Sequence, residues 1–357
     1  MSRSFLTLRA RWGALFTGAM LTLLALSPAP AWATHTVRVS DPFEITDALD
    51  EAARSNDPVI IELADGVYQL RATLQVRSAG VSLRSASGDP RKVIIEGDRM
   101  AEDALIGNLI WVGASDFTLS GITLRRAGNH LVQVAGELDV NRVVLENCVL
   151  QDSYQQMVKV SRDEGSRPDS YSDDGRIEGC EFSYTAGIAP QYYVGGIDAH
   201  GARRWVVRNN VFRDIASPKG EIAEYAIHFW DASSDTLVEH NTIIDCDRGI
   251  GFGLHGRPHS GGIIRRNLVL HADNGDPFAD TGISLIDAGG AVVQGNKIFL
   301  AHEYPWAIEL REPLTRNVLV IDNIANRPIQ TSPGQGHRLV DNRADRSVPI
   351  PEQWLKR

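Results

Sequence analysis

Cysteine and long apolar segments are both scarce in this sequence. Only three cysteines occur among 357 residues, which excludes a small disulfide-rich scaffold, and no Cys/His spacing matches a structural zinc site. The one extended apolar run lies near the N-terminus and is short for a membrane span, and no second run follows. The chain must therefore fold around an ordinary hydrophobic core, without a disulfide framework or a bilayer.

The first 33 residues have the features of a secretory signal peptide. Arg3, Arg9 and Arg11 form a basic start, residues 13–26 are apolar, and Ala31-Trp32-Ala33 fits an A-x-A cleavage site. We expect cleavage after Ala33 and a periplasmic or secreted mature protein. No cysteine lies near that site, so we expect no lipid anchor.

Basic residues are outnumbered by acidic ones. Removing the three arginines of the N-terminal segment, which has no acidic residue, takes the formal charge from −9 to −12. A net-negative protein is a poor general binder of nucleic acid or of anionic membranes. We therefore expect no nucleic-acid partner and no membrane anchor, and an acidic polymer would need a local basic patch.

What the sequence does contain is a repeat of about 30 residues. A motif of one apolar residue, two variable residues and Asn or Cys recurs, with steps of 32, 30, 31, 26, 29, 27 and 19 residues. Its last position is held in turn by Cys148, Cys180, Asn210, Asn241, Asn267, Asn296, Asn323 and Asn342. Each unit has two short stretches of period-two alternation, which is typical of strands and not of helical repeats.

Stacked units of this kind bury a continuous core between coils about 4.8 Å apart. An Asn that recurs at one corner can bond the turn backbone and the Asn of the next coil, forming a ladder. Cys148 and Cys180 occupy the same column, so they form either a disulfide, which export would permit, or two stacked buried thiols. Cys246 aligns with Ile215, and we expect it in the core.

With these repeats the chain resembles the right-handed parallel β-helix proteins of the pectate-lyase-like superfamily. The resemblance covers about residues 59–342 and includes Asp65-Gly66-Val67-Tyr68, which is similar to the first coils of alginate and chondroitin lyases. It implies an all-β solenoid, and we expect a monomer with a single domain over residues 34–357. The same scaffold supports lyases, hydrolases, epimerases and adhesins, so it specifies fold more than function.

We expect both ends of the solenoid to be covered. Residues 41–55 predict an amphipathic helix with Asp41 as N-cap, Pro42 in the first turn and a capping-box-like Glu44. Its apolar stripe would close the first coil and prevent edge-to-edge growth; the stripe consists of Ile45, Ala48, Leu49 and Ala52. The tail, residues 343–357, is expected to cover the far end.

The candidate site lies on the strands that precede the Asn corners. Gly196–His200 and Ala226–Trp230 alternate alike and should stack, with polar side chains outward. The inward column reads Val132, Val158, Ile197, Ile227, Ile250, Ile283 and Ile308; the outward column reads Gln133, Lys159, Asp198, His228, Gly251, Ser284 and Glu309; the outward column beyond it reads Ala135, Ser161, His200, Trp230, Gly253, Ile286 and Arg311. Outward positions are polar by default, so it is the coincidence of Lys, Asp, two His and Trp that indicates a groove.

Five long loops interrupt the coils, and long connections are often functional. They span residues 161–175, 183–195, 216–224, 253–262 and 271–281. Grouped on one side, they would wall a groove. Gly251 and Gly253 would leave room there for a sugar close to the backbone.

The residue types fit uronate chemistry, in which a proton next to a carboxylate is removed. Lys159 and Arg248 would neutralise the carboxylate, with Asp198 beside them. His228 or His200 would be the base. Tyr192 or Tyr193 would be the acid, Trp230 would face the sugar ring, and Arg162, Arg203 and His255 would contact substrate from flanking loops.

Family motifs add partial support. Asp198-Ala199-His200 is similar to the Asp-Pro-His-Asp motif of periplasmic mannuronan epimerases, with Ala199 in place of Pro and Gly201 in place of the last Asp. Lys159 matches the Lys of alginate and chondroitin lyases, which often use calcium, but no Arg follows on the next rungs. Only Leu254-His255-Gly256 resembles a polygalacturonase motif.

We therefore predict an exported lyase or epimerase that acts on an acidic polysaccharide or oligosaccharide, with no assigned metal ligand and calcium as an optional cofactor. A non-catalytic glycan- or protein-binding β-helix is the first alternative. A glycoside hydrolase that uses Asp198 and Asp231 as a carboxylate pair is the second. A metal-handling protein with Asp198, His200 and His228 as ligands is the third.

Overall fold

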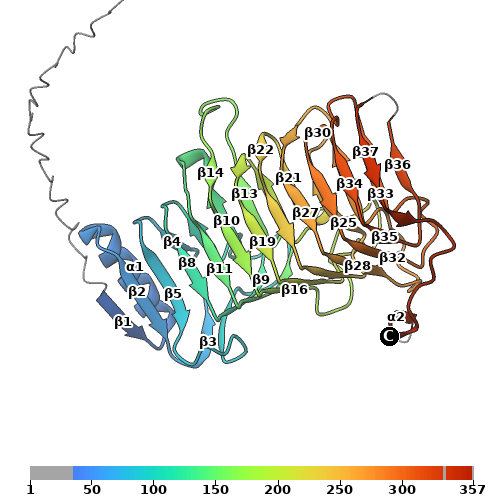
Figure 1. The fold of residues 1–357 in the computed structure, drawn as a ribbon. Helices are drawn as coiled ribbons and strands as arrows, with labels where there is room; N and C mark the ends of the chain where they lie inside the picture. Colours follow the sequence, from blue (N-terminus) through green and yellow to red (C-terminus); the bar gives the residue numbers. More distant parts are fainter. Residues whose placement is uncertain (1–34, 333–334, 356–357) are drawn as a thin grey trace, which may run out of the picture. The chain divides into compact units, whose positions relative to one another are not determined.

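The computed structural model describes residues 35–332 and 335–355. The predicted signal peptide lies outside the described residues. Within them, the chain winds through successive coils, each of which adds one strand to each of three long parallel sheets (Figure 1). No helix in these ranges has the length and apolar character needed to cross a bilayer.

Sheet A has 12 strands and precedes the Asn corner. Its strands are β1 (His35–Val39), β2 (Val59–Leu63), β5 (Val81–Ser85), β8 (Thr118–Ser120), β11 (Val144–Glu146), β15 (Arg176–Glu178), β19 (Val206–Arg208), β23 (Leu237–Glu239), β27 (Ile263–Arg265), β31 (Val292–Gln294), β34 (Leu319–Ile321) and β37 (Arg338–Val340). The strand β1, which pairs in parallel with β2, was not expected from the sequence.

Sheet B has 11 strands and follows the Asn corner. Its strands are β3 (Gly66–Gln69), β6 (Val93–Glu96), β9 (Thr123–Ala127), β12 (Val149–Ser153), β16 (Glu181–Ser183), β20 (Val211–Arg213), β24 (Thr242–Ile244), β28 (Leu268–His271), β32 (Lys297–Leu300), β35 (Ile324–Ala325) and β38 (Arg343–Ala344).

Sheet C has 10 strands and carries the candidate site, and the short sheet D has five strands between sheets C and A. Sheet C consists of β4 (Leu74–Val76), β7 (Ile110–Val112), β10 (Val132–Ala135), β13 (Val158–Ser161), β17 (Ile197–His200), β21 (Tyr225–Trp230), β25 (Arg248–Phe252), β29 (Ile283–Ile286), β33 (Ile308–Arg311) and β36 (Ile329–Thr331). Sheet D consists of β14 (Ser172–Asp173), β18 (Ala202–Arg203), β22 (Ser233–Ser234), β26 (His259–Ser260) and β30 (Ala288–Gly289), and a 3-10 turn covers Gly136–Leu138.

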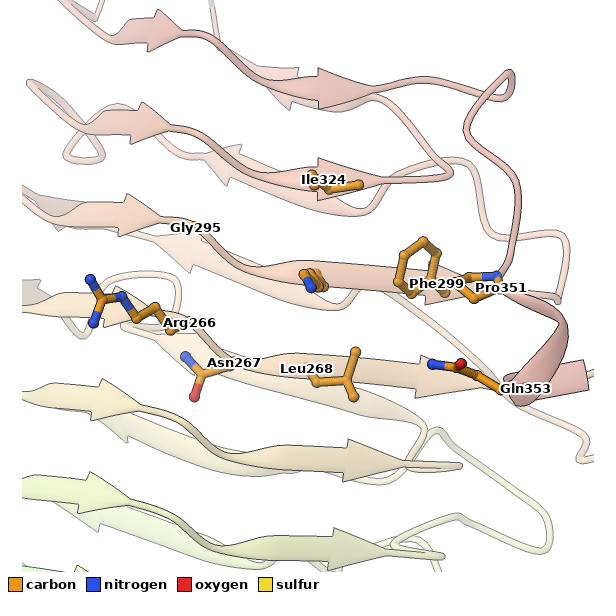
Figure 2. Close-up of a pocket in the computed structure, with 9 residues that line it drawn as sticks. Arg266, Asn267, Leu268, Gly295, Phe299, Ile324, Pro351 and Gln353 are labelled. Carbon is orange, nitrogen blue, oxygen red and sulfur yellow. The ribbon is translucent and has the colours of Figure 1, made fainter.

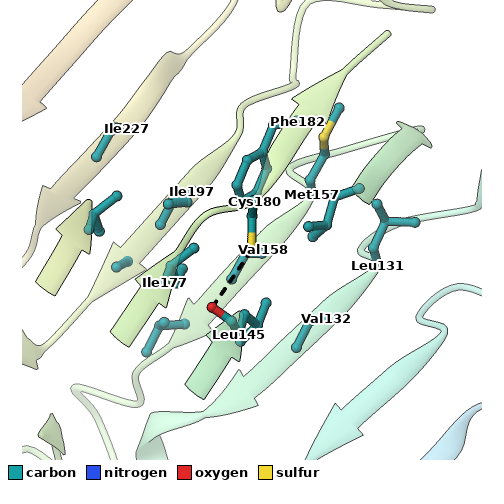
Figure 3. Close-up of a cluster of buried hydrophobic side chains, with 14 of the residues drawn as sticks. Leu131, Val132, Leu145, Met157, Val158, Ile177, Cys180, Phe182, Ile197 and Ile227 are labelled. Atoms are coloured by element: carbon teal, nitrogen blue, oxygen red, sulfur yellow. Dashed lines mark hydrogen bonds between the residues drawn. The ribbon is translucent and has the colours of Figure 1, made fainter. Parts of the chain in front are cut away.

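Inward side chains of the three long sheets form one core. In Figure 3 residues from successive coils, such as Val132, Val158 and Ile197, stack in line, and all three are fully buried. The inward column predicted from the sequence is thus confirmed from Val132 to Ile308. Stacking of like residues lets each coil bury the apolar face of its neighbour.

The predicted Asn ladder is present at the corner between sheets A and B. Each Asn side chain donates from Nδ2 to the Oδ1 of the next Asn, as from Asn241 to Asn267 at 3.0 Å and from Asn267 to Asn296 at 3.0 Å. The same Oδ1 accepts the backbone N–H of the preceding Asn, at 2.9 Å for Asn241 onto Asn267. These bonds satisfy buried polar groups at a corner that β-pairing leaves open.

The two cysteines of this column are free thiols in the structure. The Cys180 Sγ accepts the backbone N–H of Cys148 at 3.4 Å and donates to the Leu145 carbonyl at 3.6 Å (Figure 3). Cys180 therefore takes the place that Asn holds in later coils. Cys246 is buried in the core together with Ile215, as expected.

The helix α1 (Pro42–Ser55) has Asp41 as its N-cap, and the Asp41 carboxylate accepts the N–H groups of Phe43 and Glu44. The Glu44 carboxylate in turn accepts the N–H of Ser40, the residue before the N-cap, at 2.6 Å, an arrangement similar to a capping box but displaced by one residue. The predicted stripe is buried: Ile45, Ala48, Leu49 and Ala52. The helix contacts β1, β2 and β4, the strands of the first coils.

The C-terminal tail does not lie where the sequence led us to expect. Instead of crossing the far end, Val348 and Ile350 pack with Ile244, Leu270 and Phe299 on the outer face of sheet B. A groove of about 560 Å³ lies beside the tail, between Pro351 and Gln353 and the strands β28 and β32 (Figure 2). The outer face of sheet B is apolar at these positions, and the tail removes part of that surface from water.

The ladder gives a test of what holds the coils together. Replacing Asn267 by Ala would leave the donors of Asn241 and the Asn296 and Val238 acceptors without their partner in a buried corner. We expect the free energy of unfolding to fall by roughly 3 kcal/mol, measured by urea denaturation followed by circular dichroism. Asn274→Ala, at an exposed loop residue, is the control, and an equal loss in both variants would contradict the role of the ladder.

Candidate functional site

The predicted outward columns are confirmed in their register. Lys159 of β13 pairs with Asp198 of β17, and Asp198 pairs with His228 of β21. His200 and Trp230 face each other across the same two strands. Parallel pairing in register places these five side chains on adjoining rungs of sheet C.

Asp198 is the centre of this group, although its side chain is only 2% exposed. One carboxylate oxygen accepts the Lys159 ammonium and the other accepts the indole N–H of Trp230. Burial by itself raises the pKa of a carboxyl, but His200 and the charges of Lys159 and His228 hold the pKa of Asp198 well below its usual value. Asp198 is therefore an anchoring carboxylate that stays ionised, and it orients its neighbours.

His200 connects Lys159 to a second carboxylate, Asp231. Its Nε2 lies 2.8 Å from the Lys159 Nζ, and its Nδ1 lies 3.3 Å from the Asp231 Oδ2. Burial opposes protonation of the ring, but the interactions with Asp198 and Asp231 raise the pKa of His200 above its usual value. A proton on Nε2 would face the ammonium, so the 2.8 Å contact belongs to the neutral ring with its proton on Nδ1.

Asp231 is held at the turn that follows β21. The residue adopts φ 53°, a left-handed conformation that turns the chain out of the strand. The Arg162 and Arg257 guanidinium groups lie 3.5 and 3.4 Å from its carboxylate. Burial opposes ionisation, but His200 and Glu164 bonds and the Arg162 charge lower the pKa of Asp231 to about 2. This keeps a negative charge behind the His200 Nδ1–H.

The chain requires a glycine at position 201, directly after β17 and beside Arg162. It has φ +55°, and a Cβ there would lie 2.6 Å from the Arg162 side chain. The absence of a side chain therefore lets Arg162 pass beside β17 and reach Asp231. The glycine that departs from the epimerase-like motif thus has a structural reason in this chain.

His228 lies beside Asp198 with a different environment. Its Nε2 donates to the Gly253 carbonyl at 3.0 Å, and its ring stacks on Trp230 with centroids 5.4 Å apart. Its Nδ1 faces Asp198 and Glu224 at 3.9 and 3.8 Å and has no hydrogen-bond partner within the described part of the chain.

Two expectations about open space are wrong. A Cβ on Gly251 would meet the rings of His228 and Tyr225 at 2.9 Å, and one on Gly253 would lie 2.0 Å from the Ile286 carbonyl. The room beside these glycines is filled by the protein's own aromatic rings and backbone, and no sugar fits there. These small residues permit close packing around His228.

The long loops flank sheet C at both ends of its strands and do not gather on one side as predicted. The connections 184–196, 214–224 and 272–282 enter sheet C, and 162–171 and 253–258 leave it. Asp198 and His228 are buried although they point outward from the strands. Their neighbours include side chains of sheet C: Lys159 and Trp230 at Asp198, and Tyr225 and Trp230 at His228.

The remaining predicted residues are more dispersed. Arg248 lies near Asp280 at 3.4 Å and over the Tyr225 ring, next to His228. Arg203 forms a bidentate pair with Asp173 in sheet D. His255 is 82% exposed and faces Glu312. Tyr192 and Tyr193 are exposed on the 184–196 loop, and among the described residues neither takes part in the hydrogen bonds or ring contacts that join the five central side chains.

Sequence reasoning missed Glu224, Arg257 and the positioning role of Asp231. Glu224 stands four residues before His228, and Asp231 directly follows Trp230, so proximity along the strand was an available signal. Arg257 comes from a loop, and no pattern places it over the Trp230 ring, 5.4 Å from the centroid.

A second polar group continues the outward column beyond Gly251. The Tyr304 hydroxyl donates to Glu309 at 2.9 Å, and burial raises the pKa of Glu309. Asp280, which lies 3.4 Å from Arg248, adds to that rise. Sheet C thus carries two neighbouring polar groups, one around Asp198 and one around Glu309.

Comparison with known proteins agrees with this architecture. A family model described as a right handed beta helix region matches residues 107–311, more than half of the chain. The chain belongs to the right-handed β-helix family. No curated protein matches the sequence.

Several solved structures share the right-handed β-helix fold. An alginate lyase from Paenibacillus sp. str. FPU-7 has a TM-score of 0.57 at 15% identity, covering 87% of this chain and 99% of that one. A glycoside hydrolase has a TM-score of 0.65 at 10% identity, covering 89% and 98%. DFA-IIIase from Arthrobacter chlorophenolicus A6 has a TM-score of 0.53 at 12% identity, covering 81% and 76%. At such low identity the likeness concerns the fold alone.

Asp247, which directly precedes β25, holds the 214–224 loop through hydrogen bonds, and it predicts that stability depends on pH. Its carboxylate accepts the N–H groups of Ser217 and Ala223 at 3.0 and 2.8 Å. Burial raises its pKa to about 6, with the charge of Asp276 adding to the rise and His271 opposing it. Because the folded protein holds the Asp247 proton more tightly than the unfolded chain does, protonated Asp247 stabilises the fold. This stabilisation is fully present below about pH 4 and is lost as pH rises through about 6.

We expect Asp247→Asn to remove that pH dependence. The free energy of unfolding is measured by urea denaturation at each pH. Between about pH 4 and 7 it should fall by roughly 1–2 kcal/mol more in the wild type than in Asp247→Asn. Asp273→Asn, at an exposed carboxylate nearby, should leave the wild-type profile intact. Parallel profiles for wild type and Asp247→Asn would refute the assignment.

Proposed function

We propose that this protein is an exported enzyme that acts on an acidic polysaccharide or oligosaccharide by removing the proton next to a uronate carboxylate. The observation that carries the proposal is the chain Lys159–His200–Asp231, in which a cation, an imidazole and a buried carboxylate follow one another at 2.8 and 3.3 Å. The predicted signal peptide supports export. Two structures of the same fold are named for action on carbohydrates, an alginate lyase and a glycoside hydrolase.

In this proposal each of the three side chains has its own role. Asp231 holds the proton of His200 on Nδ1, which leaves the Nε2 lone pair as the base for the substrate proton once Lys159 turns to the substrate carboxylate. The Lys159 ammonium neutralises that carboxylate as negative charge develops on it. The electron pair of the broken C–H bond enters the carboxylate group.

From this intermediate two outcomes are possible within one mechanism. In a lyase the C4–O bond breaks, the electron pair leaves with the oxygen, which takes up a proton from water, and a double bond forms. In an epimerase a proton returns to the same carbon from the opposite face. Asp198-Ala199-His200, which is similar to an epimerase motif, supports the second outcome, and Lys159 is shared with the lyases.

The distribution of charge favours an anionic ligand despite the negative net charge. Asp198 and Asp231 have side chains that are 2% and 4% exposed, whereas the Lys159, Arg162 and Arg257 side chains are 13%, 10% and 45% exposed. A ligand that approaches therefore meets Arg257 and Lys159 before it meets Asp198 or Asp231. Two more exposed carboxylates also border the site: Glu164, 48% exposed and 3.5 Å from Arg257, and Glu224, 26% exposed and 3.8 Å from His228. The ring of Trp230 is partly exposed, with the Arg257 guanidinium over it and the His228 ring stacked on it, so a sugar would stack there only after Arg257 moves aside.

A glycosidase that uses Asp198 and Asp231 is less well supported. A general acid needs a raised pKa, and both carboxyls have lowered values. Both also contact the His200 ring, from its two nitrogens. They consequently serve the imidazole and do not flank an open cleft as an acid and nucleophile pair would.

The first test is a substrate panel with the purified protein comprising residues 34–357. Alginates, pectate and glycosaminoglycans are incubated with and without Ca²⁺ or Zn²⁺. Absorbance of new double bonds identifies a lyase, and deuterium uptake at the uronate carbon from heavy water identifies an epimerase. We expect one of the two signals with at least one polymer. Shortened chains without either signal, or no reaction with any uronate, would overturn the proposal.

With an active substrate in hand, His200→Gln tests the assigned base. Glutamine keeps polarity but cannot take up a proton, so we expect kcat to fall by about 10²- to 10⁴-fold while the protein stays folded by circular dichroism. His240→Gln changes an exposed histidine and should retain full turnover. Near-normal kcat in His200→Gln would remove His200 from the mechanism.

A further inference from the structure

Three ligand-type atoms converge next to the Lys159–His200–Asp231 chain but are not used by it. The Nδ1 of His228 lies 3.9 Å from the Asp198 Oδ1 and 3.8 Å from the Glu224 Oε2. All three atoms lie within 4.8 Å of one another. They come from β17, from β21 and from the end of the loop that enters β21.

The orientation of His228 is the second and independent observation. Its Nε2–H donates to the Gly253 carbonyl at 3.0 Å, so in the neutral ring the lone pair is on Nδ1. That Nδ1 is buried and has no hydrogen-bond partner among residues 35–332 and 335–355, and the side chain is only 3% exposed. The ring is fixed between Tyr225 and Trp230, at centroid distances of 4.6 and 5.4 Å.

A histidine held in this way is typical of a metal ligand. One ring nitrogen donates to a backbone carbonyl, which fixes the tautomer and aims the other nitrogen at the ion. Without an ion, a buried acceptor that faces two carboxylates is left unsatisfied, which is costly in a protein interior. Asp198 has Lys159 and Trp230 as partners, so the unsatisfied atom of this group is the His228 Nδ1.

We propose that Asp198, Glu224 and His228 bind one divalent transition-metal ion of the Zn²⁺ type. One imidazole nitrogen and two carboxylates suit Zn²⁺, Mn²⁺ or Co²⁺, whereas Ca²⁺ prefers an all-oxygen shell. Metal–ligand bonds of about 2.1 Å bring ligand atoms to roughly 3.4 Å from one another. The 3.8 Å and 3.9 Å separations close to that value with a small movement.

The burial of the three residues suits such a movement and leaves an entry path. Asp198 and His228 are fixed, with side chains 2% and 3% exposed, and Glu224 is 26% exposed at the end of its loop. Glu224 can therefore close on the ion from the solvent side. Of the ligands expected from the sequence, Asp198 and His228 are retained and Glu224 replaces His200, which is engaged with Lys159 and Asp231.

The same geometry could also be satisfied by a proton on the His228 ring. An imidazolium at His228 would place N–H on Nδ1 between the two carboxylates and would need no metal. The two accounts differ in one measurable respect: only the first predicts stoichiometric uptake of Zn²⁺ by the native protein.

The experiment is a calorimetric titration of ZnCl₂ into tag-free protein of residues 34–357 that has been stripped with EDTA and exchanged into buffer. We expect one ion per chain, a rise in melting temperature on adding Zn²⁺, and weak or no competition by Ca²⁺. Co²⁺ in place of Zn²⁺ should give a visible absorption band. These readouts do not require turnover, so they stand whether or not the proposed reaction is found.

Matched variants locate the ion. Glu224→Gln should weaken Zn²⁺ binding by about 100-fold or more, since a ligand contributes more than the outer residues that orient it. Glu221→Gln, at an exposed carboxylate on the same loop, should bind as the wild type does. Glu224 is partly exposed, so this pair stays informative even if His228→Gln unfolds. No uptake by the wild type, or unchanged uptake in Glu224→Gln, would overturn the site.

Discussion

The parallel pairing of one coil on the next is the interaction on which everything else in this protein depends. It fixes the register of sheet C, so that Lys159, Asp198 and His228 stand on consecutive rungs. It also aligns the corner residues, whose amides then bond from coil to coil, as from Asn241 to Asn267. A shift of one residue in β13, β17 or β21 would turn the polar side chains of that strand into the core.

Burial converts this aligned column into a site. Outward residues of a solenoid are normally solvated, and a mixed charge ladder in water contributes little. Here Asp198 and His228 are almost completely buried, with Lys159, Tyr225 and Trp230 of sheet C packed around them. In such an environment a carboxylate must be paired, and Asp198 is paired with Lys159 and the Trp230 indole. In the same surroundings the His228 Nδ1 has no hydrogen-bond partner among the residues that the structure describes, which is the reason for inferring a metal ion there.

Much of the fold could be predicted because the repeat is visible in the amino-acid sequence. Period-two alternation gives the strands, and the Asn column gives the corner, since each follows from local chemistry repeated at a regular step. The helix over Pro42–Ser55 could also be predicted, from its N-cap residue and its stripe of apolar residues. The strand β1 and the course of the tail were not, because both depend on contacts with surfaces that exist only after the coils have stacked.

The sequence by itself determined which residues share a column, and hence the grouping of Lys159, Asp198, His200, His228 and Trp230, because parallel register converts spacing along the chain into neighbours in space. Tertiary structure alone decided which of the outlying candidates join them. Loop paths placed Arg257 and Glu224 at the site and left Arg203 and His255 with partners elsewhere. Packing also filled the space beside Gly251. Such contacts follow no period, since each loop is fixed by particular hydrogen bonds such as those of Asp247.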